Sequence, residues 1–179
     1  PDPKSRLSNY PYELSGGMAQ RVMIAMAIAG KPDILIADEP TTALDVTIQL
    51  QILKLLKEIQ KKNNMAILFI THDLGVVAKI SDRIQVLYAG EIIEEGNTVN
   101  IIRNPGHPYT MGLLKSIPSP NKIDQELFNI KGIVPSLDQR PKGCQFAPRC
   151  ESVKEECQSE SIRLYQHGEN QIRCLLGKK

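Results

Sequence analysis

Two acidic residues and a histidine follow two short apolar segments of the sequence, and their chemistry suits a phosphate group. Asp38 and Glu39 come directly after the segment 33–37, and His72 comes shortly after the segment 65–70. Short apolar runs bounded by proline and polar residues are typical of buried strands. Neighbouring parallel strands end at one edge of a sheet, which is where α/β proteins bind ligands. If the two strands are neighbours, we expect the acids and the histidine to lie together.

Each of these three side chains suits one task in the hydrolysis of a phosphate ester. An aspartate at this edge can hold Mg²⁺, directly or through water, and this is the predicted role of Asp38. Glu39 can polarise the attacking water. His72 can hydrogen-bond the terminal phosphate and keep Glu39 and the water in line. Taken alone, each residue also fits an ordinary surface turn or a structural role, so the interpretation depends on their convergence.

A serine and two glycines precede a helix pattern in the string LSGGMAQR, residues 14–21. Residues 18–29 are mostly Ala, Met, Ile and Val, which favours a helix, and Gly30 and Pro32 end it. A helix start carries unpaired N–H groups and the positive end of the dipole, so glycines there let an anion approach the backbone. The alternative is an ordinary helix start that has Ser15 as its N-cap.

The remaining pattern of the first hundred residues predicts an α/β fold. Spaced apolar residues predict an amphipathic helix over 46–62, and a short helix is expected over 74–80. Residues 83–96 predict two strands that meet in a hairpin around Ala89-Gly90. Continuous apolar strands that alternate with helices indicate a parallel sheet covered by helices.

Composition narrows the classes of partner. The chain has 179 residues, 41% of them hydrophobic and 23% charged, which is typical of a globular protein. Its net charge of +2 is too small to indicate binding to nucleic acid or to membrane lipid. The longest apolar run, residues 22–29, is far shorter than a bilayer span of about 20 residues. We therefore expect any membrane location to depend on a partner.

All four cysteines lie near the C-terminus, at Cys144, Cys150, Cys157 and Cys174. In a reducing compartment, closely spaced cysteines favour a metal site over disulfides. Their spacing is not the C-x₂-C of common zinc sites. It leaves room for a bulkier group, and four thiolates suit a four-iron, four-sulfur cluster, [4Fe–4S]. Zinc, reduced thiols and a disulfide remain as alternatives.

The strings LSGGMAQR, ILIADEP, ALD and THD resemble the signature motif, Walker B motif, D-loop and switch histidine of ABC-transporter ATPases, in the same order. The resemblance covers residues 8–100. It implies a P-loop NTPase-type sheet and binding of ATP and Mg²⁺. It also implies that Glu39 is the catalytic base, that His72 senses the γ-phosphate and that Asp38 serves Mg²⁺. The cofactor-contacting residues implied at the interface with a second subunit are Ser15, Gly16, Gly17, Gln20 and Asp45.

A narrower resemblance concerns the segment NPGHPYTMGLLKSIP, residues 104–118. It is similar to the start of the C-terminal extension of dipeptide, oligopeptide and nickel importer ATPases. Some members of this branch hold an iron–sulfur cluster on a cysteine quartet in that extension. The two resemblances imply an ATPase part over 1–103 and an extension with the four cysteines over 104–179.

The resemblance implies an ATP-hydrolysing subunit of a peptide importer, peripheral on the cytoplasmic face of the membrane. Its expected partners are a second ATPase subunit, identical or homologous, the membrane permease subunits and, indirectly, an extracytoplasmic peptide-binding protein; no nucleic acid is expected. No G-x-x-x-x-G-K-S/T string occurs in the sequence. We therefore expect the chain to correspond to the C-terminal part of a longer protein and to be inactive alone.

Two other functions fit parts of the sequence. One is a soluble ABC-type ATPase in DNA repair or translation, which long insertions between the motifs or a second signature would favour; neither is present. The other is a metal-binding or redox-sensing module in which the ATPase part is vestigial. Metal and partner binding by the cysteine segment would distinguish this alternative.

Overall fold

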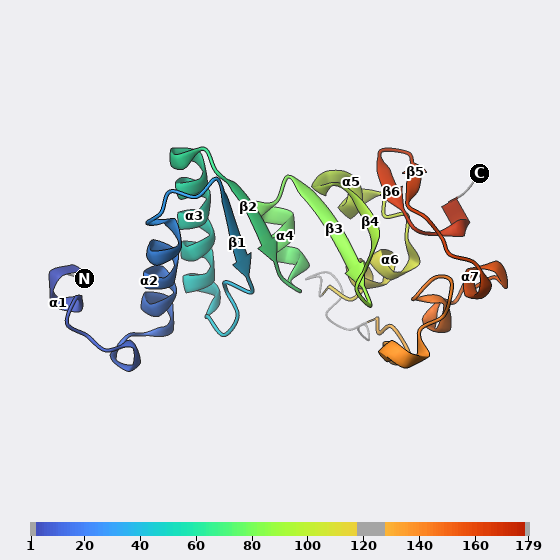
Figure 1. Ribbon diagram of the computed structural model, residues 1–179, viewed down its shortest axis with the longest axis horizontal. Helices are drawn as coiled ribbons and strands as arrows, with labels where there is room; N and C mark the ends of the chain where they lie inside the picture. Colours follow the sequence, from blue (N-terminus) through green and yellow to red (C-terminus); the bar gives the residue numbers. More distant parts are fainter. Residues whose placement is uncertain (1–2, 118–127, 178–179) are drawn as a thin grey trace. The chain divides into compact units, whose positions relative to one another are not determined.

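The computed structural model describes residues 3–117 and 128–177 (Figure 1). The chain divides into two compact units, Pro1–Asp73 and Leu74–Lys179. The division expected at residue 103 follows the two sequence resemblances rather than compactness, and it stays a prediction.

The first unit is a pair of parallel strands with two helices packed on one face. β1 (Ile34–Asp38) pairs with β2 (Ala66–Ile70) in parallel, so that the last residue of each strand lies opposite the other. α2 (Gly16–Ile28) and α3 (Val46–Asn63) cover this pair (Figure 1). The predicted parallel strands are therefore confirmed, and α2 starts at Gly16 rather than at the predicted Met18. A short helix α1 (Pro3–Arg6) and a 3-10 turn (Pro11–Glu13) precede α2.

Alternation along β1 decides which side chains form the core of this unit. Leu35 and Ala37 point toward the helices and are buried, whereas Ile34 and Ile36 point away and are 62% and 65% exposed. The buried cluster joins one strand, both helices and the residue before β2, and consists of Ile24, Leu35, Ile52, Leu56 and Met65. Within the strand pair, Asp38 at the end of β1 lies opposite Ile70 at the end of β2.

The second unit is built on an antiparallel sheet in the order β3-β4-β6-β5. α4 (Leu74–Ile80) leads into β3 (Arg83–Tyr88) and β4 (Glu91–Asn97), which form the predicted hairpin. Ala89 and Gly90 both have positive φ, 47° and 83°, as a tight two-residue hairpin turn requires. The strands β5 (Tyr165–His167) and β6 (Asn170–Ile172) come from the far end of the chain, and β6 pairs with β4.

The segments between β4 and β5 complete the second unit. α5 (Thr98–Arg103) and α6 (Pro108–Lys115) follow β4, and α7 (Glu156–Ser159) precedes β5. Three short 3-10 turns cover Leu137–Gln139, Ala147–Arg149 and Leu175–Gly177. The cysteine segment shares one buried cluster with the hairpin, since Phe146 and Ile162 pack with Tyr88, Ile93 and Ile101.

None of the helices in the described parts of the chain has the length and apolar character needed to cross a membrane.

Candidate functional site

Glu39 and His72 are in direct contact at the carboxyl edge of the strand pair. β1 and β2 are parallel neighbours, so the turns that follow them begin side by side. The Nδ1 atom of His72 lies 2.8 Å from Oε1 of Glu39. Glu39 has a φ of 45°, an unusual value for a residue with a side chain, and its N–H donates to the carbonyl of Ile70 at 2.9 Å. The chain turn after β1 is thereby tied to the end of β2.

Hydrogen bonds also set the charge of this pair. The hydroxyl of Thr42 donates to Oε2 of Glu39 at 2.6 Å. This bond, and then the contact with His72, lowers the pKa of Glu39, while the neighbouring carboxylate raises the pKa of His72. Glu39 is therefore an ionised acceptor with both oxygens oriented, which is the form that a general base needs.

Asp38 lies at the end of a strand, and Asp45 lies at the start of a helix. Asp38 is the last residue of β1, is exposed, and lies opposite Ile70 of β2. Its place at the strand end suits an oxygen ligand for a divalent cation beside Glu39. Asp45 is the N-cap of α3, and its carboxylate accepts the N–H of Ile48 at 3.0 Å. This hydrogen bond gives Asp45 a structural task within the unit, in addition to the predicted interface role.

The residues of the signature string lie at the start of α2. Ser15 is at the N-cap position, but its side chain makes no capping hydrogen bond, so the simple alternative of a serine cap has no hydrogen bond to support it. Ser15 and Gly16 are exposed, and Gln20 lies one turn further along and is half-buried. The first turn of α2 therefore presents backbone to the solvent, as an anion site requires.

The two glycines of this turn differ in their surroundings. A Cβ atom on Gly17 would come within 2.6 Å of Cγ2 of Ile48 on α3, which is a steric overlap. A Cβ on Gly16 would meet Cδ2 of Leu44 at 3.4 Å, an ordinary contact. Close packing of α2 against α3 thus explains the absence of a side chain at Gly17, a reason that the sequence analysis did not identify. Packing gives no such reason at Gly16.

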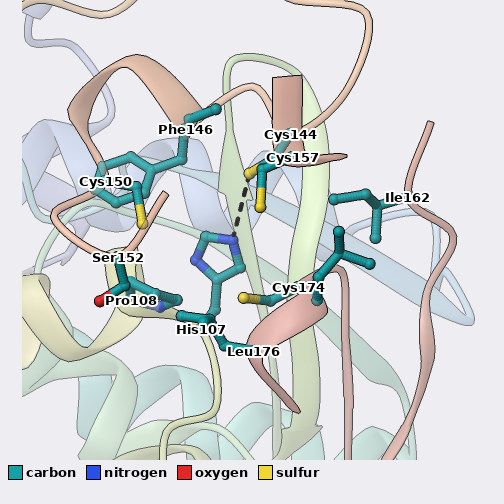
Figure 2. Close-up of a pocket in the computed structure, with 12 residues that line it drawn as sticks. His107, Pro108, Cys144, Phe146, Cys150, Ser152, Cys157, Ile162, Cys174 and Leu176 are labelled. Carbon is teal, nitrogen blue, oxygen red and sulfur yellow. Dashed lines mark hydrogen bonds between the residues drawn. The ribbon is translucent and has the colours of Figure 1, made fainter. Parts of the chain in front are cut away.

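The four cysteines line one pocket in the second unit (Figure 2). Figure 2 shows their sulfur atoms arranged around the imidazole ring of His107. Cys144 and Cys157 are held together by the backbone, because the N–H of Cys144 donates to the carbonyl of Cys157 at 2.7 Å. All four cysteines are free thiols, so the disulfide alternative has no support in the structure.

Apolar surroundings control the chemistry of these thiols. Burial raises the pKa of Cys144 and Cys150, and raises that of Cys174 to about 11. The cavity between the side chains measures about 10 Å³, about the space of one water molecule. Among the residues that the structure describes, no three His, Cys, Asp or Glu side chains are placed to hold a metal ion. The arrangement therefore does not by itself support the expected iron–sulfur cluster or zinc ion.

A buried carboxylate next to this pocket was not predicted from the sequence. Glu94 on β4 has no exposed surface, and its oxygens accept the N–H groups of Gly106 and His107 at 2.6 and 3.0 Å. The amide of Asn170 on β6 also donates to Glu94, at 3.3 Å. Glu94 thereby fixes the turn that carries His107. Its sequence neighbours include other glutamates, so no pattern could have distinguished it.

The fold and the strand ends define the class: an α/β protein with an acid pair and a histidine at the edge of two parallel strands. Comparison with known proteins specifies the family. Residues 1–42 match the family model described as ABC transporter, and residues 93–157 match the model for the C-terminal region of oligopeptide and dipeptide transporters. Both segments of the chain therefore resemble ABC-transporter ATP-binding proteins of this peptide type.

Individual relatives agree with this assignment. The Dipeptide transport ATP-binding protein DppD of Haemophilus influenzae is 52% identical over 174 residues, which cover 97% of this chain and 53% of that protein. The protein of the same name from Escherichia coli is 53% identical, over 92% of this chain and 50% of its own length. The Oligopeptide transport ATP-binding protein OppD of Haemophilus influenzae is 50% identical, over 94% and 53%. The chain spans about half the length of these relatives.

A solved structure supports the fold. It is described as an inward-facing conformation of a metal-chelate type ABC transporter, and it matches with a TM-score of 0.52 and 32% sequence identity. The match covers 59% of this chain and 40% of the other.

Proposed function

We propose that the chain carries the hydrolytic residues of an ATPase that drives a peptide importer. The observation that carries this proposal is the 2.8 Å contact between Glu39 and His72 at the carboxyl edge of two parallel strands. The relatives are dipeptide and oligopeptide transport ATP-binding proteins, and they supply the transported class in this proposal. Whether peptides or nickel are carried depends on proteins outside this chain.

Glu39 acts on the attacking water in this proposal. Its carboxylate is ionised and is oriented by Thr42 on one oxygen and by His72 on the other. His72 is 80% exposed at its side chain, so it can reach a terminal phosphate while it holds Glu39. Asp38, one residue before Glu39, would hold Mg²⁺, which supplies charge stabilisation at the phosphate when it is bound.

In this proposal, the start of α2 contacts an ATP molecule other than the one on which Glu39 acts. We assign Ser15, Gly16, Gly17 and Gln20 to the γ-phosphate of ATP held by a second ATPase subunit. Asp45 lies at the start of α3, which packs against α2 within the unit, and in this proposal it contacts the same partner. Closure of the two subunits around ATP, and their opening after hydrolysis, would move the permease subunits. The proposed location is the cytoplasmic face of the membrane, as a peripheral subunit.

Turnover of the full-length ATPase subunit tests this function. We expect Glu39→Gln to lower ATP hydrolysis 10²- to 10⁴-fold, the range for loss of a general base, with little change in ATP binding. The matched control is Glu58→Gln on the exposed surface of α3, where the glutamate lies 4.0 Å from Lys54. Near-normal hydrolysis by Glu39→Gln would contradict the role of Glu39. Equal losses in the two variants would contradict the site.

The cysteine pocket supports a second proposal, that residues 104–179 form an extension that binds a [4Fe–4S] cluster, with zinc as the alternative. Four soft sulfur donors and an apolar wall are the chemistry that such a cluster selects. The side chains line one pocket but must move apart to admit it, since the cavity is only about 10 Å³. A metal-binding or redox-sensing role for this segment is the second candidate function.

Anaerobic isolation of the chain tests the metal proposal. We expect iron and sulfide to bind in a ratio of four each per chain, and any single Cys→Ser variant at the four positions to weaken that binding. Stoichiometric zinc would keep the site and change the ion. A metal-free protein after anaerobic purification and after supply of iron, sulfide or zinc would refute the site.

A further inference from the structure

Glu39 and His72, the two residues of the proposed hydrolytic pair, are held in different ways. The backbone of Glu39 is fixed on both sides, because its N–H donates to the carbonyl of Ile70 at 2.9 Å and its carbonyl accepts the N–H of Thr42 at 3.2 Å. The side chain of His72 is 80% exposed and meets Glu39 through Nδ1. The place of this exposed imidazole therefore depends on what holds the turn of residues 71–73.

Side chains from two elements hold this turn. Thr71 closes it locally, since its Oγ1 accepts the backbone N–H of Asp73 at 3.1 Å. The carboxylate of Asp73 accepts a second hydrogen bond from the side-chain amide of Gln49 on α3, with 3.4 Å between Nε2 and Oδ2. All three side chains are half-buried, and partial shielding from water strengthens a hydrogen bond to a charged group. Gln49 thus ties the turn after β2 to a helix.

The part of α3 that carries Gln49 is firmly placed. Asp45 caps the helix by accepting the N–H of Ile48 at 3.0 Å. Ile48 packs so closely on the start of α2 that a Cβ on Gly17 would overlap it, and Ile52, one turn further along α3, has no exposed surface. A side chain on a packed helix is positioned more precisely than one on a loop. The amide of Gln49 is therefore a well-placed anchor.

We propose that Gln49 is a positioning residue for the proposed hydrolysis: its amide holds Asp73, and Asp73 keeps the adjacent His72 against Glu39. The inference rests on the proposed function for the use of the His72–Glu39 contact, whereas the hydrogen bond itself does not depend on it. Gln49 contacts no nucleotide in this account. Its loss should therefore slow the chemical step and leave the binding of ATP unchanged.

Exchange of the donor and the acceptor tests this role. Gln49→Glu puts a second carboxylate against Asp73, so the hydrogen bond is lost and the two groups repel. Asp73→Asn in the same protein restores a bond in the reverse direction, because the asparagine amide can donate to the new carboxylate. Glutamine and glutamate have nearly the same shape, so the comparison changes the hydrogen bond and the charge but not the packing volume.

The first measurement is ATP turnover by the full-length subunit. We expect Gln49→Glu to lower kcat about tenfold with KM for ATP within about twofold, as for a displaced catalytic group. When Asp73→Asn is already present, the same substitution should change kcat by less than about twofold. Equal losses in the two backgrounds, or a rise in KM with kcat unchanged, would overturn the proposal.

The second measurement reads the position of His72 without turnover. Proton nuclear Overhauser spectra of the 179-residue chain detect contact between the His72 ring and the Glu39 side chain. We expect this contact in the original chain, its loss in Gln49→Glu and its return when Asp73→Asn is added. Gln49→Leu removes the donor without adding charge and covers the case in which Gln49→Glu does not fold. It should show the same loss, and Asp73→Asn should not restore the contact.

A contact between His72 and Glu39 that persists in a folded Gln49→Glu or Gln49→Leu chain would overturn the positioning role. Near-normal hydrolysis by Glu39→Gln would instead overturn the proposed function, and the spectra would still decide whether Gln49 places His72.

Discussion

At the scale of single residues, hydrogen bonds give the ionisable groups their chemistry. Glu39 is kept ionised by Thr42 and His72 at the solvent-exposed strand edge. His107 is in the opposite situation, because its burial lowers its pKa to about 4. One histidine is thus disposed to become charged beside a carboxylate, and the other is held neutral among thiols.

The neutral state of His107 makes the stability of the metal-free chain depend on pH. A histidine in the unfolded chain has a pKa of about 6.5. Between that value and about 4, the unfolded chain binds one proton that the folded chain does not. Lowering the pH through this window should therefore cost stability, by about 3 kcal/mol in total.

Urea unfolding of the chelator-treated chain at several pH values measures this effect. The free energy of unfolding should fall from pH 6.5 to pH 4 in the original chain, and the fall should be smaller in His107→Asn. An identical pH dependence in the two proteins would show that His107 does not bind a proton on unfolding.

The acid pair and the histidine could be predicted from the sequence because they follow strands whose apolar runs are visible. The expectation that both strands are buried was wrong, since β1 is buried on one face and β2 has no buried residue. Thr42 could have been suspected only weakly, as a hydroxyl three residues after Glu39. Glu94, His107 and Asn170 could not be predicted as a cluster, because contacts between residues far apart in the sequence create it. Patterns of local periodicity carry no information about such contacts.

At the scale of elements, the contact between α2 and α3 decides which side chains fit in the first turn of α2. Gly17 faces Ile48 and has no space for a side chain, whereas Gly16 has ordinary clearance. From the sequence alone, both glycines are expected to provide an opening for an anion. The structure assigns a packing requirement to one of them.

Alanine substitutions should separate the two glycines. Gly17→Ala should destabilise the chain by about 1–3 kcal/mol, the usual cost of an extra buried group. Gly16→Ala is the control and should leave stability unchanged or raise it by up to about 1 kcal/mol, since alanine suits a helix better. Denaturant unfolding measures both values. Equal effects of the two substitutions would mean that the packing of α2 on α3 does not differ at these positions.

A second glycine supports the cysteine pocket. A Cβ on Gly143 would overlap the backbone carbonyls of Cys157 and Glu160, next to the hydrogen bond between Cys144 and Cys157. Gly143→Ala should therefore separate these two cysteines and increase their rate of alkylation several-fold. Gly30→Ala, where no atom lies within 4 Å of the added Cβ, is the control. Unchanged alkylation in Gly143→Ala would contradict the close backbone pairing.

At the scale of the whole molecule, the chain carries two kinds of site in two compact units. The strand-edge site and the start of α2 lie in the first unit, and the cysteine pocket lies in the second. The sequence predicted the α/β class and the element order up to the hairpin. It did not predict that β6 would pair with β4, because strands of three residues are too short to show a period.

The central proposal is that the first turn of α2 completes the ATP site of a second subunit. The most direct measurement is ATP-dependent dimer formation by the full-length subunit with Glu39→Gln, which should keep ATP bound. Adding Gly16→Asp places a negative side chain at the proposed position of the γ-phosphate. It avoids the steric overlap with Ile48 that a side chain in place of Gly17 would cause. We expect ATP binding to the subunit's own phosphate loop to persist and the ATP-dependent dimer to be lost. A dimer of undiminished stability in the Gly16→Asp protein would contradict the proposal.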